Sequence, residues 1–321
     1  MKRRNFISLV GWAAAWPFTA RAQQGQRMRR IGLMGNLPLR PIERFRKALR
    51  ELGYVENRNL VIEYRFAEGR DERYPAFAAE LVAQPVDLIV TWGTPAAFAA
   101  KQATATIPIV LGAIGDAVNT GLVPNLARPG GNITGFVALN VDLEEKRLEL
   151  LKELLPHLSR VAVLGNSLNP LNRINLDTAR RVAQRLAVTI DAFEVRSSQD
   201  IGGALRAIAA ARPEAVLLAS DTQLLSERKQ IADAMATSRT PEIYPFREYF
   251  EVGGFIAYGA NLSILFERAA GYVDRILKGE PANLPVQQAT AFEILINLKA
   301  ATGLGLTLPP SVLVRADEVI E

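Results

Sequence analysis

The sequence predicts an α/β fold of two Rossmann-like lobes with parallel sheets, joined by hinge crossovers. Short apolar runs alternate with amphipathic stretches along most of the chain, a pattern typical of a parallel sheet with helices on both faces. The alternation restarts after a cluster of turn-forming residues at 129–132. With 321 residues, the chain is long enough for two domains.

The first half of the chain predicts strands and helices in strict alternation. Arg30 to Gly35 is an apolar first strand, and Pro41 then begins an amphipathic helix that ends at Gly53. The strand that follows, at 60–66, alternates in polarity, so one of its faces lies nearer water. The further elements are a helix with the stripe Tyr74, Phe77 and Leu81, a strand at 86–90, a helix at 96–103 and a strand at 107–111.

The second half repeats this alternation and ends in an irregular tail. Ile133 to Val137 is expected to be a strand, and Asp142 and Glu145 resemble a capping box for a charged helix. The late elements could return to the first lobe and cross again, which gives 28–140 plus about 250–282 for the N-terminal lobe and 141–249 plus about 283–321 for the C-terminal lobe. Expected elements are a helix at 143–155, strands at 161–164, 188–195, 215–219, 242–244 and 255–258 with helices between them, a helix at 263–278, a strand at 292–297 and a short helix before Pro309.

Three landmarks recur at a nearly constant offset, which favours an internal duplication. The first is Arg30-Ile-Gly-Leu-Met-Gly-Asn36, which matches Arg160-Val-Ala-Val-Leu-Gly-Asn166. The second is Thr94, which matches Thr222, and the third is a Pro-Ile-Val match to Pro-Glu-Ile at residues 108 and 241. Each match is weak alone, but three in register predict two similar lobes whose strand-end loops meet across one cleft.

The N-terminal segment predicts export. Basic residues precede an apolar run too short to span a bilayer comfortably, and Ala20-Arg21-Ala22 is an A-x-A cleavage site. The adjacent arginines 3 and 4 leave both the general secretory and the twin-arginine routes open. Cleavage removes four basic and no acidic residues and lowers the net charge from +5 to +1, which argues against a nucleic-acid-binding protein. Since the chain has no cysteine to carry a lipid anchor, we expect it to be free in the periplasm.

The ligand site is expected where Val86 to Thr94 ends in a Trp-Gly-Thr corner. Ligands of open α/β sheets lie beyond the carboxyl ends of the strands, and a polar ligand needs donors, acceptors and an apolar wall there. Asp116 and Asp221 could pair with an ammonium group, although the carboxylates and Asn166 could equally be caps and turn formers. The candidates are Asn36, Trp92, Gly93, Thr94, Asp116, Asn166, Ser167, Asp221, Thr222, Phe246 and Tyr258.

An enzyme is the main competing interpretation, because two Rossmann-like lobes around a cleft also describe several transferases. The chain's one histidine, His157, follows a predicted helix, and we expect a surface role for it rather than catalysis. No Walker A loop, G-x-S-x-G or G-x-G-x-x-G motif follows a strand. We therefore expect no catalytic residues, cofactor or metal, while a periplasmic sensor that signals to a membrane receptor stays open as another alternative.

Several stretches together resemble a known family. They are GYVENRNLVIEYRFAEG, VDLIVTWGTPAA, IPIVLGAIGDAVNTGLV, LARPGGNITG, ILKGEPANLPV and INLKAATGLGLTLPPSVLVRADEVIE, and they span essentially the whole exported chain. The combination is similar to ABC-transporter substrate-binding proteins of the tryptophan-binding-like group. This resemblance implies a type I periplasmic binding protein fold with three crossovers, acting as a monomer that closes on a small amino-acid-like molecule and delivers it to a membrane permease. No motif specifies the ligand.

Overall fold

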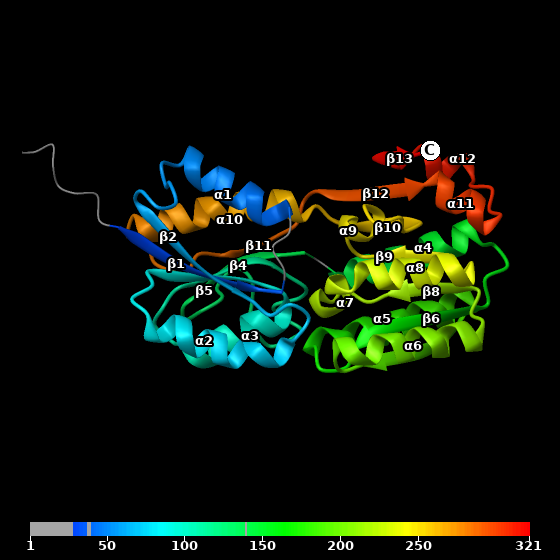
Figure 1. Ribbon diagram of the computed structural model, residues 1–321, viewed down its shortest axis with the longest axis horizontal. Coiled ribbons are helices and arrows are strands. Elements are labelled where there is room, and N and C mark those ends of the chain that lie inside the picture. The colour runs from blue at the N-terminus through cyan, green and yellow to red at the C-terminus, as the bar shows by residue number, and fades with distance from the viewer. Residues whose placement is uncertain (1–27, 37–39, 139) are drawn as a thin grey trace, which may run out of the picture.

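The computed structural model of the protein describes residues 28–36, 40–138 and 140–321. The expected signal segment at residues 1–22 lies outside these ranges. Within them, no helix combines the length and apolar character needed to cross a membrane. Two separate sheets, each covered by helices, lie side by side along the long axis of the molecule (Figure 1).

The first lobe is built on a six-stranded sheet in which all paired strands are parallel. Its order is β11-β5-β4-β3-β1-β2. Strands β3 and β4 are buried throughout, which explains their almost continuous apolar sequences, whereas the edge strand β2 is mostly half-buried. The strands are β1 (Arg29–Gly35), β2 (Leu60–Phe66), β3 (Leu88–Trp92), β4 (Ile109–Ile114), β5 (Ile133–Val137) and β11 (Val286–Gln288).

Helices cover both faces of this first sheet. Helices α1 and α10 pack together on one face, and α2 and α3 pack together on the other (Figure 1). Phe45 and Leu49 of the apolar stripe expected for α1 are buried in the core, whereas Leu52, expected on the same stripe, follows the helix and is exposed. The helices are α1 (Arg40–Glu51), α2 (Tyr74–Ala83), α3 (Thr94–Ala103) and α10 (Leu262–Leu277), and the 3₁₀ turn η1 (Asp71–Arg73) precedes α2.

The second lobe is built on a seven-stranded sheet of order β13-β12-β10-β9-β8-β6-β7. Strands β10 and β12 are antiparallel and the other pairs are parallel, so the sheet is mixed rather than fully parallel as expected. The exception arises because the chain re-enters this lobe through β12. The strands are β6 (Arg160–Asn166), β7 (Thr189–Val195), β8 (Ala215–Leu218), β9 (Glu242–Tyr244), β10 (Ile256–Ala260), β12 (Phe292–Asn297) and β13 (Glu318–Ile320).

Helices also cover both faces of the second sheet. Residues of α4, α5 and α11 share one core with it, and residues of α6, α7, α8 and α9 belong to another, which continues into the first lobe. Asn169 caps α5 through a hydrogen bond from the Leu171 amide to its side chain. The helices are α4 (Asn140–Leu154), α5 (Pro170–Leu186), α6 (Ser198–Ala211), α7 (Thr222–Ser226), α8 (Arg228–Ser238), α9 (Arg247–Phe250), α11 (Leu298–Leu304) and α12 (Pro310–Leu313).

The described chain passes between the two sheets three times. The crossings lie between β5 and α4, between β10 and α10, and between β11 and β12. The second and third crossings come later in the sequence than the expected positions near 250 and 282, because β10 pairs with β9 and β11 pairs with β5. The polar sequence of β11, Val-Gln-Gln, has too little apolar character to predict a strand.

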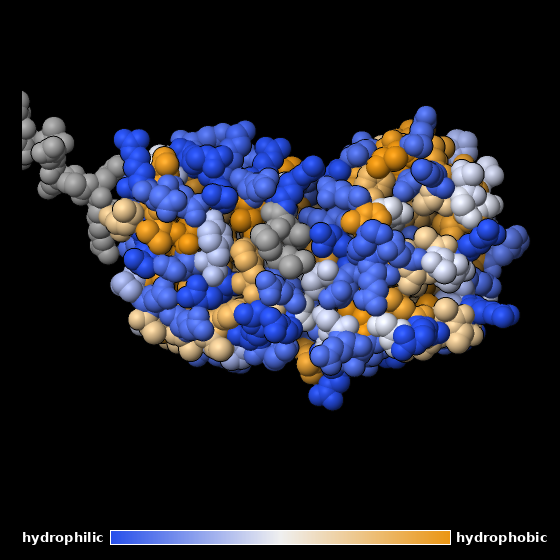
Figure 2. Space-filling view, in the orientation of Figure 1, coloured by the Kyte–Doolittle hydropathy of each residue, from blue (hydrophilic) through white to orange (hydrophobic). Residues whose placement is uncertain are grey.

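The duplicated register corresponds to matching topology in the two lobes. Strands β2-β1-β3-β4-β5 of the first sheet have the same order as β7-β6-β8-β9-β10 of the second. Thr94 and Thr222 begin the helices that follow β3 and β8, while Asn36 follows β1 and Asn166 ends β6. The prolines of the third match directly precede the fourth strand of each lobe. The carboxyl ends of the parallel strands of both sheets face each other across the junction, where the molecular outline narrows (Figure 2).

Candidate functional site

A pocket lies between the lobes, at the carboxyl ends of strands from both sheets. Its lining comes from the ends of β3, β4 and β5 in the first lobe and from the segments after β6, β8 and β9 in the second. The free volume is about 20 Å³, enough for about one water molecule. A larger ligand therefore requires the lobes or the lining side chains to move apart. The pocket is lined by Trp92, Gly93, Thr94, Ala113, Ile114, Gly115, Ala138, Asn169, Leu171, Ser220, Asp221, Thr222, Phe246 and Leu262.

The first lobe contributes an aromatic wall with little room around it. Trp92 is the last residue of β3 and is 3% exposed, and its ring meets Phe266 edge-on at 6.4 Å between centroids. A side chain at Gly35 would place its Cβ 1.7 Å from the Trp92 Nε1, so the ring occupies the space above that glycine. The Trp92 Nε1 has no hydrogen-bond partner among the described residues.

The corner after Trp92 needs glycine for two reasons. Gly93 has a φ of 83°, in the left-handed region that favours glycine. A Cβ on Gly93 would also lie 2.8 Å from the Oγ1 of Thr222, which belongs to the other lobe. The two lobes therefore touch directly at this point, and only a residue without a side chain allows it.

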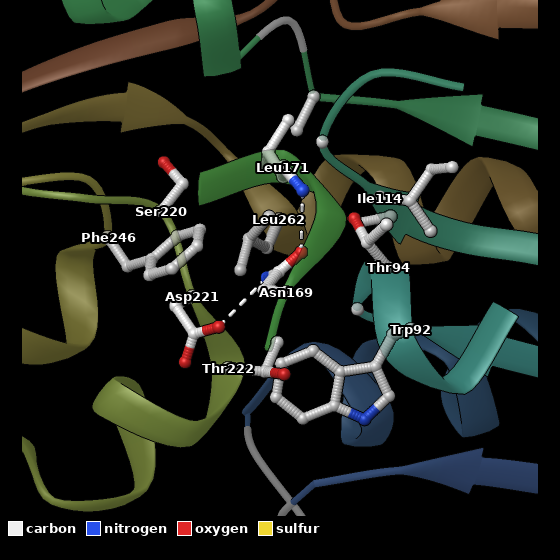
Figure 3. A pocket seen from close by; sticks show the side chains of 14 residues that line it. Trp92, Thr94, Ile114, Asn169, Leu171, Ser220, Asp221, Thr222, Phe246 and Leu262 are labelled. Atoms are coloured by element: carbon white, nitrogen blue, oxygen red, sulfur yellow. Dashed lines mark hydrogen bonds between the residues drawn. The ribbon is translucent and has the colours of Figure 1, made fainter. Parts of the chain in front are cut away.

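The second lobe contributes the charge of the pocket. Asp221 is 3% exposed and caps α7, where its Oδ1 accepts a hydrogen bond from the Leu224 amide at 2.8 Å. Its Oδ2 accepts from the Nδ2 of Asn169 at 2.8 Å (Figure 3). The same oxygen accepts from the Nδ2 of Asn166 at 3.2 Å. Burial raises the pKa of Asp221 above its ordinary value, although these hydrogen bonds act in the opposite direction.

Figure 3 shows how the two lobes face each other in the pocket. The side chains of Trp92, Thr94 and Ile114 lie on one side, and those of Asp221 and Phe246 lie on the other. Among the described lining residues, Asp221 is the one with a charged side chain. The described residues include no group of three or more histidine, cysteine, aspartate or glutamate side chains that could hold a metal ion.

A polar network beside the pocket joins the lobes. The Gly69 carbonyl accepts hydrogen bonds from the Oγ of Ser198 at 3.0 Å and from the Nε2 of Gln223 at 3.1 Å. The Asn166 Nδ2 donates to the Oε1 of Gln223 at 2.7 Å and lies 3.5 Å from the Oδ2 of Asp71. Burial, followed by the charge of Asp221, raises the pKa of Asp71 to about 8. The loop after β2 thus reaches the second lobe directly.

The structure brings most of the predicted residues together. Eight of the eleven candidates lie at the junction, and each of these follows or ends a central strand of its lobe. Asn36 and Asn166 are fully buried in the polar network rather than in the pocket lining, and Asn36 accepts from the Gly69 amide at 2.6 Å. The candidates in the lining are Trp92, Gly93, Thr94, Asp221, Thr222 and Phe246.

The structure places the other three candidates outside the pocket lining. Both carboxylate oxygens of Asp116 accept hydrogen bonds within its own turn, from Val118 and Asn119, as the turn-forming alternative predicts. Ser167 is exposed, and its hydroxyl donates to the Val195 carbonyl at 3.3 Å. Tyr258 lies in the middle of β10 and packs against the core on the α4–α5 face of the sheet, not at a strand end.

Sequence reasoning missed several residues of the junction. Asn169 and Leu171 enter the pocket from the start of α5, and the Asn-Pro pair at 169–170 is a cap signal that would have located the first of them. Asp71 follows the carboxyl end of β2, so the same strand-end rule applied to the second strand would have included it. Leu262 comes from a crossing segment, which no local pattern marks.

Comparison with known proteins places this geometry in a family. Residues 40–320 match the model of the family described as ABC transporter substrate binding protein. A tyrosine-binding protein of Clostridioides difficile is 26% identical over 279 residues, covering 85% of this chain and 80% of the relative. A conserved domain protein of Vibrio cholerae O1 biovar El Tor has a TM-score of 0.85 at 28% identity, covering 91% of this chain and 100% of that one. An ABC domain of Streptococcus pneumoniae in complex with L-Trp has a TM-score of 0.83 at 27% identity, covering 91% and 99%.

Proposed function

We propose that this chain, which belongs to the family of ABC transporter substrate-binding proteins, captures an aromatic amino acid between its two lobes. Proteins of this family bind a small molecule and deliver it to the membrane permease of an ABC importer. The two lobes, the three crossings and the pocket at the junction are the parts that such capture requires.

The observation that carries the proposal is the pairing of one buried carboxylate with an aromatic wall. Asp221 offers its charge to a ligand ammonium, while Trp92 and Phe246 offer apolar surface to a side chain. The Thr94 hydroxyl, also in the lining, is available to a ligand carboxylate. The relatives that bind tyrosine and L-Trp support this class of ligand.

Titration of the protein without residues 1–22 tests the proposal. This form retains Trp92 as its one tryptophan, so emission reports on the pocket, and calorimetry covers ligands that themselves fluoresce. We expect L-tyrosine, L-tryptophan or L-phenylalanine to give saturable heat, with benzoate as the comparison that lacks an amine. A hundredfold excess of ligand over its dissociation constant should stabilise the fold by about 2.7 kcal/mol. No heat and an unchanged melting temperature with all three amino acids would contradict the proposed ligand class.

The place of action is part of the proposal. Family membership supports a role outside the cytoplasm, and the basic and apolar pattern of residues 1–22 supports export with cleavage after Ala22. We expect the tagged protein in the periplasmic fraction, with Gln23 as its first residue by N-terminal sequencing. Retention of residues 1–22 in the fractionated protein would contradict this part.

A further inference from the structure

Two carboxylates from opposite lobes meet beside the pocket, and we call Asp71 and Asp221 the acid pair. Asp221 caps α7 in the second lobe, whereas Asp71 lies in η1, after β2 of the first lobe. Both accept from the same atom, the Nδ2 of Asn166, at 3.5 Å for Asp71 and 3.2 Å for Asp221. Since the two residues belong to different lobes, their proximity is a property of the closed arrangement.

The donors around the acid pair serve Asp221, which accepts from the Leu224 amide and from the Nδ2 atoms of Asn169 and Asn166, far better than they serve Asp71. The Asn166 Nδ2 has two hydrogens, and it faces the acid pair and also the Oε1 of Gln223 at 2.7 Å. The hydrogen bonds to Asp71, from Asn36 and from Asn166, are both 3.5 Å long, which is at the limit of a hydrogen bond. No described cation makes an ion pair with either carboxylate. A full negative charge on Asp71, beside that of Asp221, is therefore poorly compensated.

Two buried hydroxyl groups next to the acid pair strengthen this conclusion. Tyr74 and Thr222 are 1% and 6% exposed, and neither hydroxyl makes a hydrogen bond of good geometry among the described residues. Tyr74 is close enough to both carboxylates for each to raise the pKa of its phenol, after the larger effect of burial. Neither hydroxyl donates a well-formed hydrogen bond to Asp71 or Asp221, so the shortage of donors at Asp71 remains.

We propose that Asp71 is a specificity-determining residue, because the cleft closes fully only when one positive charge, either a proton or a ligand ammonium group, joins the acid pair. In the open form Asp71 is separated from Asp221 and faces solvent, so it needs no proton. A ligand ammonium that reaches Asp221 from the pocket replaces the proton, whereas a ligand with only a carboxylate cannot. The ligand part of this proposal rests on the proposed function, but the proton part does not.

The direction of the pH dependence follows from this arrangement. The pKa of Asp71 is about 8 in the closed form, against an ordinary value of 3.8, so the closed form holds a proton that the open form releases. Closure without ligand is therefore favoured at low pH and weakens as the pH rises towards about 8, by up to about tenfold in the closed-to-open ratio per pH unit. The other titratable groups that interact with the pair are Glu72, Tyr74 and Tyr249 of α9.

Small-angle scattering of the ligand-free protein between pH 5 and pH 8 tests the proton part. We expect the radius of gyration to decrease as the pH falls, with a parallel change in Trp92 emission. Asp71→Asn should remove this pH dependence without changing the melting temperature at pH 8 by more than a few degrees. Asp116→Asn is the matched control, since its carboxylate serves only its own turn, and it should behave like the unmodified protein. A radius that is independent of pH in the unmodified protein, or equally dependent on pH in Asp71→Asn, overturns the proposal.

A second experiment tests the charge selectivity at pH 8, where the proton is scarce. L-Tyrosine is compared with 3-(4-hydroxyphenyl)propionate, which keeps the ring and the carboxylate but has no amine. We expect the ratio of their affinities to fall at least about fivefold in Asp71→Asn, because this variant closes without an added positive charge. An unchanged ratio overturns the selectivity role. Failure of both compounds to bind the unmodified protein contradicts the proposed function instead, and the scattering experiment still decides the proton part.

Discussion

The same corner of the duplicated fold carries different residues in the two lobes. Trp92-Gly93-Thr94 links β3 to α3, and Ser220-Asp221-Thr222 links β8 to α7, at the same offset of 128 residues. The threonines begin their helices in both lobes. The residue before each threonine is the helix cap, and it is a glycine without a side-chain bond in the first lobe but a buried aspartate in the second.

This difference shows how the same strand-to-helix corner contributes the shape of the pocket in one lobe and its charge in the other. In the first lobe the missing side chain of Gly93 lets Thr222 of the other lobe come close, and Trp92 provides an apolar wall. In the second lobe Asp221 provides the charge, held in place by Asn169 and by the amide of Leu224. We infer that the first lobe sets the shape of the closed pocket, and that Asp221 of the second lobe supplies the charge that Asp71 of the first lobe makes selective.

Removing the charge of Asp221 in the second lobe should have the largest effect on ligand affinity. In Asp221→Asn the ligand ammonium loses its charged partner, while asparagine still caps α7. Truncating one partner of a buried charge pair costs about 2–5 kcal/mol, so we expect the affinity for the amino acid found by titration to fall by about 30-fold or more. Calorimetry measures this loss, and far-ultraviolet circular dichroism checks the fold. Affinity within about twofold of the unmodified protein would remove Asp221 from the site.

Adding a side chain at Gly93 in the first lobe should have the second largest effect on ligand affinity. In Gly93→Ala the added Cβ meets the Oγ1 of Thr222 at 2.8 Å in the closed form, and overpacking costs about 1–3 kcal/mol. We expect affinity to fall by about fivefold or more, mainly through faster ligand release, which stopped-flow emission measures.

Gly121→Ala separates the effect of closure from the effect of backbone strain. Gly121 has a φ of 76°, similar to that of Gly93, but a Cβ there would meet nothing within 4 Å. Both variants should therefore melt at a lower temperature than the unmodified protein, whereas only Gly93→Ala should bind more weakly. Equal affinities in the two variants would mean that contact across the junction does not limit closure.

The sequence predicted the repeated parts of this molecule well, for a physical reason. Buried parallel strands must be apolar and must end in turns, so β3, β4, β6 and β8 are visible as short runs of valine, isoleucine and leucine. The duplicated register then places the Trp92 and Asp221 corners at equivalent strand ends, before any contact is known.

The parts that depend on long-range pairing could not be predicted in the same way. Strand β11 is a strand because β5 offers it a parallel edge, not because Val-Gln-Gln is apolar. Asp116 and Asp221 both follow strands, but their local sequences do not tell that one carboxylate turns into its own loop and the other into the pocket. The partner of Asp71 lies 150 residues away in sequence, in the other lobe, and only the closed fold brings the two together.

The smallest expected effect comes from a contact that touches no ligand. In Ser198→Ala the Gly69 carbonyl loses one of its two hydrogen bonds from the second lobe. A hydrogen bond contributes about 0.5–1.5 kcal/mol net, and because this one exists only in the closed form, we expect an affinity loss of about threefold that is the same for every ligand. Ser238→Ala is the matched control, since its hydroxyl bonds only within the second lobe, to Met235 and Thr240, and it should leave affinity unchanged. A loss that differs between tyrosine and tryptophan would show instead that Ser198 acts on the pocket, and that the second lobe sets ligand preference through more than its charge.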